Sequence, residues 1–282
     1  MKYVVSGITT NKREGGNGYD AAGSLTAFPE LGWELMITRL HIIDMLQSEV
    51  ISEDDIIITT PDRYFLYNNI FKNVSTWNKT THTEIEPFSY LNIPRSDIID
   101  LTEVSAMEEY LNRQIWEPRY KYFDRDLDLL LKIDTSIERI FNTAAPFVCI
   151  LARFRTWCSE RNTDVQYLND MIDFLHNIGI GVFVFGEGAE NELKNTNANY
   201  VNLQEACHLM GHQNCKFVYG AYSGAMHLGF FCCKSKLLIH LFDFYNAPIY
   251  HPLYFGRGVN FTGISVFSCD YSTKNADWLK YL

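Results

Sequence analysis

Ser223, Gly224 and His227 are the residues of this chain best suited to bind phosphate. They follow Lys216-Phe217-Val218-Tyr219, a run that predicts a buried strand, and Ser223-Gly224 stand where the next helix should begin. Ligands of parallel α/β sheets bind at the carboxyl ends of the strands, where a helix N-terminus offers N–H groups and the positive end of its dipole. The pattern therefore predicts a phosphate site of the kind that holds a nucleotide-sugar.

Two more predicted strands end in polar loops. The apolar run at residues 147–151 precedes Arg153 and Arg155, whose guanidinium forks suit a diphosphate, unless they are solvent-facing residues or partners of acids. The run at residues 182–185 precedes Gly186-Glu187-Gly188, whose glycines permit a close approach of backbone and ligand. Glu187 either binds a ribose hydroxyl or only solvates the loop.

Residues 146 to 242 resemble the donor-binding half of GT-B glycosyltransferases, most closely the heptosyltransferase-like and fucosyltransferase-like branches. The resemblance rests on the S-G-x-x-H-L run that begins at Ser223 and on the order of the surrounding elements. It implies that Ser223, Gly224 and His227 face the donor's diphosphate, with the arginine-bearing loop beside them. Tyr222 stands where the heptosyltransferase-like pattern often has an acid.

The same resemblance implies two further roles. Residues 199–203 look like the short strand and helix beside which these families hold the nucleoside, so Asn202 and Leu203 are expected donor contacts. A carboxylate in the first loop of the N-terminal domain would be the base that takes the acceptor's proton, which here suggests Asp20, with Glu14 and Glu34 as rivals. Alternatively, Asp20 is a turn residue that holds its own backbone.

Composition excludes several classes of protein. The chain has 282 residues and a net charge of −10, which argues against nucleic acid as a partner. No apolar run approaches the roughly 20 residues that span a bilayer, so we expect a soluble, cytoplasmic protein without a transmembrane segment. Its seven cysteines are an odd number in no regular framework, which favours reduced thiols.

No metal site is expected. The cluster of Cys207, His208, His212 and Cys215 matches no standard zinc spacing. The D-x-D-x-D run at residues 124–128 falls in a predicted helix rather than at the end of a strand, so we interpret it as a solvated surface.

The predicted fold class is α/β, with two Rossmann-like domains that face each other across a cleft, as in the GT-B type. Residues 1–142 would be the acceptor-side domain and residues 143–282 the nucleotide-sugar-binding domain with a C-terminal tail. The first domain is predicted from a strand at 3–5, a helix at 33–46, a strand at 56–58 and a helix at 64–71, followed by helical sequence over 105–141.

The predicted function is transfer of a sugar from a nucleotide diphosphate-sugar to a glycan or other hydroxyl acceptor, without a metal or other cofactor and with inversion. Arg155 and the Ser223-Gly224 turn would stabilise the departing diphosphate. Two alternatives stay open at this stage: a nucleotide-sugar 2-epimerase, and a non-catalytic protein that binds sugar nucleotides or glycans.

Overall fold

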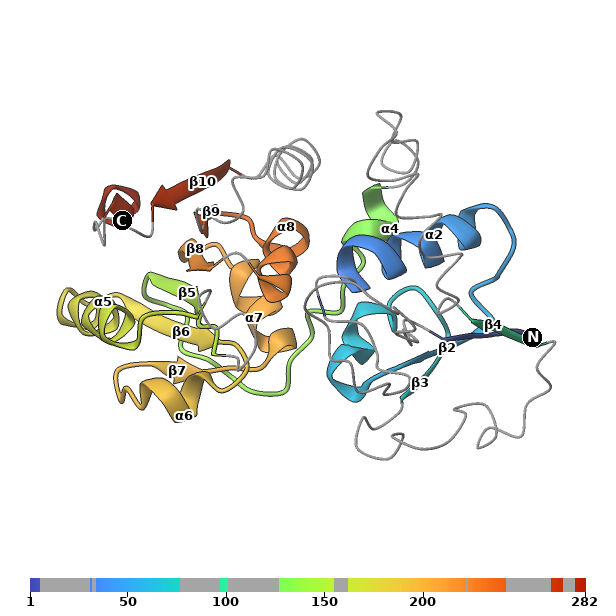
Figure 1. Cartoon of the computed structure of the whole chain (residues 1–282), viewed down its shortest axis with the longest axis horizontal. Helices are drawn as coiled ribbons and strands as arrows, with labels where there is room; N and C mark the ends of the chain where they lie inside the picture. The colour runs from blue at the N-terminus through green and yellow to red at the C-terminus, as the bar shows by residue number, and fades with distance from the viewer. Residues whose placement is uncertain are drawn as a thin grey trace, which may run out of the picture. The chain divides into compact units, whose positions relative to one another are not determined.

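The computed structural model describes residues 1–5, 31, 34–76, 97–100, 127–154, 162–221, 223–241, 265–270 and 277–282. The chain divides into two compact units, Met1–Asp134 and Thr135–Leu282 (Figure 1). The division falls before the boundary predicted at residue 142, because the segment after Asp134 bonds to the second unit. The Thr135 carbonyl accepts from His208 Nδ1 at 2.9 Å, and the Ser136 carbonyl accepts from Gln204 Nε2 at 2.8 Å.

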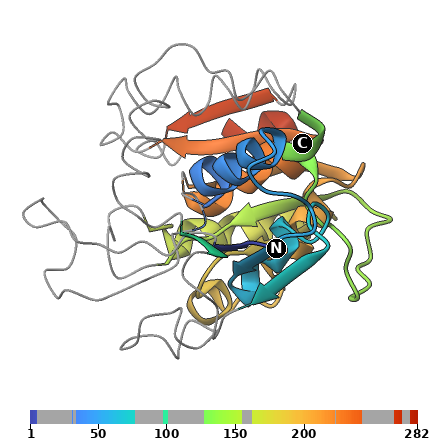
Figure 2. The ribbon, with the colours of Figure 1, turned by 90° about the vertical axis from the view of Figure 1, so that its right-hand side faces the viewer.

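Unit 1 is built on a parallel sheet with the strand order β3-β2-β1-β4 (Figure 2). Its strands are β1 Tyr3–Val5, β2 Ile56–Thr59, β3 Asn73–Thr76 and β4 Ile98–Asp100. Its helical segments are η1 Glu34–Thr38, α2 Arg39–Gln47, η2 Pro61–Leu66 and α4 Leu127–Leu131. The central strand β2 is an apolar run with Ile57 and Ile58 buried, as expected of a parallel sheet covered on both faces.

The helices of unit 1 agree with the sequence pattern in part. The helix predicted at residues 33–46 is present as a π-helical turn, η1, that continues into α2. The helix predicted at residues 64–71 is instead the short 3-10 helix η2, which begins at Pro61. The prediction of helix through residue 141 is wrong beyond Leu131, where the chain leaves α4 and continues without regular structure to β5.

Unit 2 is built on a parallel sheet with the strand order β10-β9-β8-β5-β6-β7. Its strands are β5 Phe147–Leu151, β6 Gly181–Phe185, β7 Asn199–Tyr200, β8 Cys215–Ala221, β9 Lys236–Leu241 and β10 Ser265–Asp270. Counted within the unit, this is the order 3-2-1-4-5-6 of a Rossmann fold, with the reversal between β5 and β8. Both units are therefore α/β and Rossmann-like, as predicted.

Helices cover both faces of the second sheet. They are α5 Val165–Asn177, α6 Ala189–Leu193, α7 Leu203–Met210, η6 Gly224–His227, α8 Leu228–Cys232 and η8 Asp277–Tyr281. Val148 and Ile150 of β5 pack into one core with Leu168 and Ile172 of α5. Cys149 lies between them in β5 and so points to the opposite face, which explains why every residue of this strand is buried.

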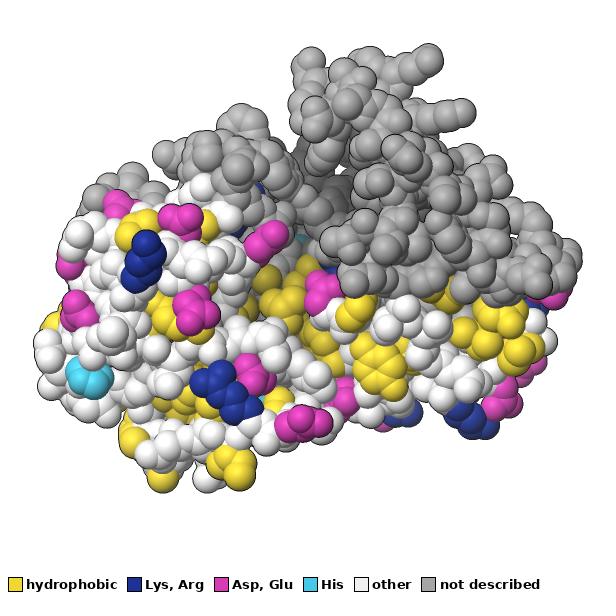
Figure 3. All heavy atoms as spheres, turned by 90° about the horizontal axis from the view of Figure 1, so that it is seen from below, with side chains coloured by type: hydrophobic (Ala, Val, Ile, Leu, Met, Phe, Trp, Pro, Cys, Tyr) yellow, Lys and Arg dark blue, Asp and Glu magenta, His cyan; other side chains and the backbone are white. Residues whose placement is uncertain are grey.

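On the face drawn in Figure 3, the basic and acidic side chains of the described residues are interspersed. Within the described ranges, no helix has both the length and the apolar character that crossing a bilayer requires.

Candidate functional site

The reversal of strand order in unit 2 lies between β5 and β8, and the carboxyl ends of these strands form the candidate site. The two strands approach each other closely there. A Cβ built on Gly220 of β8 would lie 2.7 Å from Leu151 Cβ and 2.8 Å from the Leu151 carbonyl oxygen. Only glycine fits at this position, and the residues that follow β5 and β8 are brought together at one edge of the sheet.

Ser223 and Gly224 lie at this edge, where the sequence pattern places them. Ser223 is 7% exposed and is the N-cap of η6, and its side chain makes no capping hydrogen bond. The predicted helix after the turn is present as a 3-10 turn, η6, that continues into the short α8. The first amides of such a helical segment have no partner within it, so they can donate to an anion.

His227 ends the η6 turn and is buried. Its ring packs at a tilt against the Phe230 ring, with 6.1 Å between the centroids. The structure thus places His227 on the inner side of the turn that Ser223 begins, and a contact between this side chain and a donor stays a prediction. Tyr222, which precedes the turn, lies outside the described residues.

Arg153 follows β5, and its hydrogen bonds join the two ends of the β5–α5 loop. The residue is 4% exposed. Its Nη1 donates to Asn162 Oδ1 at 2.7 Å, its backbone N–H donates to Thr163 Oγ1 at 2.9 Å, and its carbonyl accepts from Thr163 N at 2.9 Å. The sequence argument did not find Asn162 and Thr163, although they directly precede the helix cap Asp164. Arg155, the other predicted arginine, lies outside the described residues.

The Gly186-Glu187-Gly188 turn follows β6, beside β5. A Cβ on Gly186 would lie 1.9 Å from the Ala152 carbonyl oxygen, and Gly186 has a φ of +131°. The glycine is therefore required by the adjacent strand, so the close approach of a ligand is not needed to explain it. Gly188 has a φ of +76° and is the N-cap of α6, and Glu187 is exposed at the carboxyl end of β6.

Asn202 and Leu203 lie farther from the reversal, after the edge strand β7. Asn202 Oδ1 accepts from Glu205 N at 2.8 Å, and Glu205 Oε2 accepts from Asn202 N at 2.9 Å. This reciprocal pair is a capping box that begins α7, and Leu203 is the first residue of the helix. Helix capping is a sufficient physical reason for asparagine at this position.

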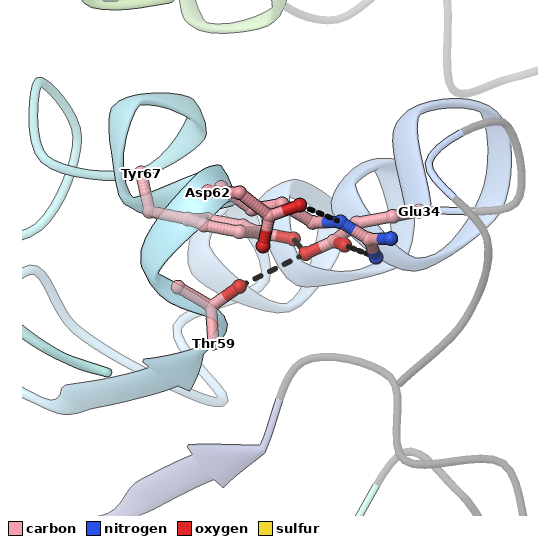
Figure 4. Close-up of polar contacts among 5 residues, drawn as sticks. Glu34, Thr59, Asp62 and Tyr67 are labelled. Atoms are coloured by element: carbon pink, nitrogen blue, oxygen red, sulfur yellow. Dashed lines mark hydrogen bonds and ion pairs between the residues drawn. The ribbon is translucent and has the colours of Figure 1, made fainter. Parts of the chain in front are cut away.

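Asp20, the predicted base of unit 1, and its rival Glu14 lie outside the described residues. Their rival Glu34 is fully buried at the start of η1 (Figure 4). Its carboxylate accepts from Thr59 Oγ1 at 3.2 Å and from Tyr67 OH at 2.9 Å, and it pairs with the buried Arg63. Arg63 and Tyr67 were missed from sequence, since they lie far from Glu34 along the chain. The cluster explains Glu34 as a structural acid.

The cysteines and histidines near α7 are held by separate contacts. Cys207 and Cys215 are buried free thiols, His208 Nδ1 bonds to the Thr135 carbonyl, and His212 Nδ1 accepts from Asn214 N at 3.1 Å. Burial raises the pKa of the Cys207 thiol well above its usual value. Among the residues that the structure describes, no three His, Cys, Asp or Glu side chains are grouped so as to hold a metal ion.

The fold is similar to that of two solved glycosyltransferases. ADP-heptose LPS heptosyltransferase II of E. coli matches with a TM-score of 0.50 and 11% identity, over 95% of this chain and 90% of that one. A glycosyl transferase family 9 protein from Veillonella parvula matches with a TM-score of 0.51 and 14% identity, over 99% of this chain and 89% of that one. This is the GT-B fold. The match spans both Rossmann-like units, in agreement with the heptosyltransferase-like branch of the predicted resemblance.

No protein-family model matches the chain, and no curated protein matches its sequence. At 11% and 14% identity the structural likeness concerns the fold, so activity has to be argued from the site.

Proposed function

We propose that the protein is a glycosyltransferase that moves a sugar from a nucleotide diphosphate-sugar to the hydroxyl group of a glycan or similar acceptor. One observation carries the proposal. The Ser223-Gly224 turn follows β8 at the strand-order reversal of a six-stranded parallel sheet, which is where such sheets bind nucleotides. The GT-B fold and the family 9 neighbour support the same reaction class.

Unit 2 is the donor unit in this proposal. The Ser223 hydroxyl and the first amides of η6 donate to the diphosphate, and Glu187 at the neighbouring strand end accepts from a ribose hydroxyl. Arg153 holds the β5–α5 loop in place, and Arg155 in that loop neutralises the leaving diphosphate. His227, at the end of η6, also contacts the donor's diphosphate.

The reaction follows from these roles. An acceptor hydroxyl attacks the anomeric carbon, the bond from that carbon to the diphosphate oxygen breaks, and the configuration inverts. Asp20 of unit 1 takes the proton of the hydroxyl, because the buried and paired Glu34 is already engaged with Arg63. Protein cations and amides, rather than a metal ion, stabilise the diphosphate that departs.

Turnover tests the proposal directly. UDP-, GDP- and ADP-sugars are incubated with an acceptor panel, in EDTA or in Mn²⁺, and both the released nucleoside diphosphate and the anomeric configuration of the product are measured. Acceptor-dependent release that survives EDTA is the expected result. Conversion of the sugar-nucleotide without an acceptor would indicate a 2-epimerase, and tight donor binding without any turnover would indicate a binding protein. Rescue by Mn²⁺ after loss in EDTA would contradict the metal-independent mechanism.

A further inference from the structure

The cysteines whose side chains the structure describes are all buried free thiols of unit 2. They are Cys149, Cys207, Cys215, Cys232 and Cys233. The proposed function uses none of them. Cys207 belongs to helix α7 and Cys232 is the last residue of helix α8, whereas Cys149 and Cys215 belong to strands β5 and β8. Thiols that lie close together can become a disulfide when an oxidant reaches them.

Helices α7 and α8 lie side by side, and their carboxyl ends meet at Gly211 (Figure 1). Gly211 is the C-cap of α7. A Cβ built on it would lie 3.3 Å from the Cys232 carbonyl oxygen and 3.6 Å from the Cys207 carbonyl oxygen. Lys234 N donates to the Met210 carbonyl at 3.2 Å, which joins the two segments again next to these helix ends. The backbones of Cys207 and Cys232 are therefore held near one another.

The side chains of this pair are in contact as well. The Cys207 thiol donates a hydrogen bond to the Cys232 sulfur. Burial, and then this hydrogen bond, raises the pKa of the Cys207 thiol well above its usual value, so Cys207 stays protonated in the reduced protein. Cys207 is fully buried, whereas Cys232 is 8% exposed, the largest exposed fraction among the five cysteines. An oxidant that reaches the pair therefore meets Cys232 first.

We propose that Cys207 and Cys232 are a redox pair, which a small disulfide such as glutathione disulfide converts into a protein disulfide between α7 and α8. Cys232 loses its proton and attacks one sulfur of the oxidant, whose S–S bond breaks, and the first glutathione leaves and takes up a proton. Cys207 then loses its proton and attacks the Cys232 sulfur of the mixed disulfide, and the second glutathione leaves as a thiol. The two protein thiols lose two electrons, and glutathione disulfide is reduced to two glutathione molecules. The inference does not depend on the proposed function.

The other neighbouring thiols are less suited to a disulfide. The Cys149 thiol donates to Cys215, but these residues lie on adjacent strands of one sheet, and Phe147 rather than Cys149 stands opposite Cys215. A bond between them would have to draw together strands whose spacing the sheet already fixes. The Ser235 hydroxyl contacts both Cys215 Sγ, at 3.7 Å, and Cys233 Sγ, at 3.4 Å. Helices α7 and α8 are separate elements, so a small relative shift can close an S–S bond of about 2 Å between them.

Peptide mapping of the wild-type protein tests the proposal. One sample is incubated with excess glutathione disulfide and another with reduced glutathione, the remaining thiols are alkylated, and the peptides are analysed by tandem mass spectrometry without reduction. A link between Cys207 and Cys232 is expected in most chains of the oxidised sample, and dithiothreitol should remove it. Alkylation of both residues after oxidation, separate glutathione adducts on both, or a link from Cys149 to Cys215 in place of the expected one would overturn the proposal.

A matched pair of variants decides which of two adjacent cysteines reacts. Cys233→Ser should form the link to Cys207 as the wild type does. Cys232→Ser should leave Cys207 alkylated after the protein is unfolded, because the contact that Cys207 makes is with Cys232. Circular dichroism checks that both variants fold, and the mapping of the wild type stands by itself if one does not. A link to Cys207 that persists in Cys232→Ser, or one that disappears in a folded Cys233→Ser, would overturn the proposed pair.

Discussion

Glu34→Gln is expected to destabilise unit 1 strongly, because the Glu34 carboxylate is a partner of the buried Arg63. Thr59 Oγ1 and Tyr67 OH donate to Glu34 Oε1, and glutamine can keep an acceptor for them. It cannot keep the charge that Arg63 faces, and both side chains of this pair are at most 5% exposed. Breaking a buried ion pair costs about 3–5 kcal/mol. For a unit of this size, the unfolding midpoint should fall by at least about 10 °C.

Calorimetry or circular dichroism of thermal unfolding measures this loss. The control is Asp62→Asn, since the Asp62 side chain is 53% exposed and lies 3.8 Å from Arg63 Nε. Losing such an exposed partner should cost no more than about 1 kcal/mol. A Glu34→Leu, Arg63→Met double variant should recover much of the loss, because apolar pairs often replace buried ion pairs well. The reasoning is refuted if Glu34→Gln melts like the wild type, and loss of sugar transfer in that variant would then make Glu34 the catalytic base.

Three further predictions concern unit 2. Gly186→Ala should lower the free energy of unfolding in urea by about 3 kcal/mol or more, because the added Cβ would clash with the Ala152 carbonyl. The control is Gly179→Ala, which has a φ of +78° but open space around it and should cost about 1–2 kcal/mol. Similar costs for the two variants would exclude the clash with Ala152 as the cause. Asn202→Ala should cost about 1 kcal/mol of stability as a lost helix cap. If capping is the only role of Asn202, nucleotide affinity should be unchanged, and a large loss of affinity would instead support the predicted donor contact. Hydrogen bonds from Asn197 and, to a smaller extent, Asn195 lower the pKa of Asp173. The stabilising contribution of Asp173 is therefore present above about pH 4 and is lost as the pH falls through the lowered pKa. Between about pH 5 and pH 2 the melting temperature of Asp173→Asn should fall less steeply than that of the wild type, and parallel falls would contradict this.

The strands of unit 2 could be predicted closely. β5 has the bounds that its apolar run suggests, and β6 and β8 extend their predicted runs by one to three residues. Central strands of a parallel sheet are buried on both faces, which makes them uninterrupted apolar segments that stand out in a sequence. The Ser223-Gly224 turn could be found for a related reason, since small residues directly follow such a segment.

Contacts between residues far apart in the sequence could not be predicted from the sequence pattern. Residues 132–141 have apolar residues at helix-like spacings, yet they form no regular structure. Two side chains of α7 donate to backbone carbonyls of this segment, and its Arg139 donates to the Tyr200 carbonyl of β7. The helix predicted at residues 33–46 does place Glu34 in its first turn, but the pairing of Glu34 with Arg63 depends on how η1 packs against η2. The packing of Gly186 against Ala152 could not be predicted, because the nearness of these residues is visible only in the folded sheet. A donor contact at Gly186 stays a prediction.

Calorimetric titration with nucleoside diphosphates tests the central claim most directly. The wild type is compared with two variants. Ser223→Ala changes the carboxyl edge of the sheet, and the control Ser235→Ala changes a serine just before β9, at the opposite edge, whose hydroxyl contacts Cys215 and Cys233. Loss of a hydrogen bond to a charged phosphate should weaken binding in Ser223→Ala by about 1.5–3 kcal/mol, or roughly 10- to 150-fold. Ser235→Ala should bind like the wild type. Unchanged affinity in Ser223→Ala, or an equal loss in both variants, would contradict a diphosphate site at the β5–β8 reversal.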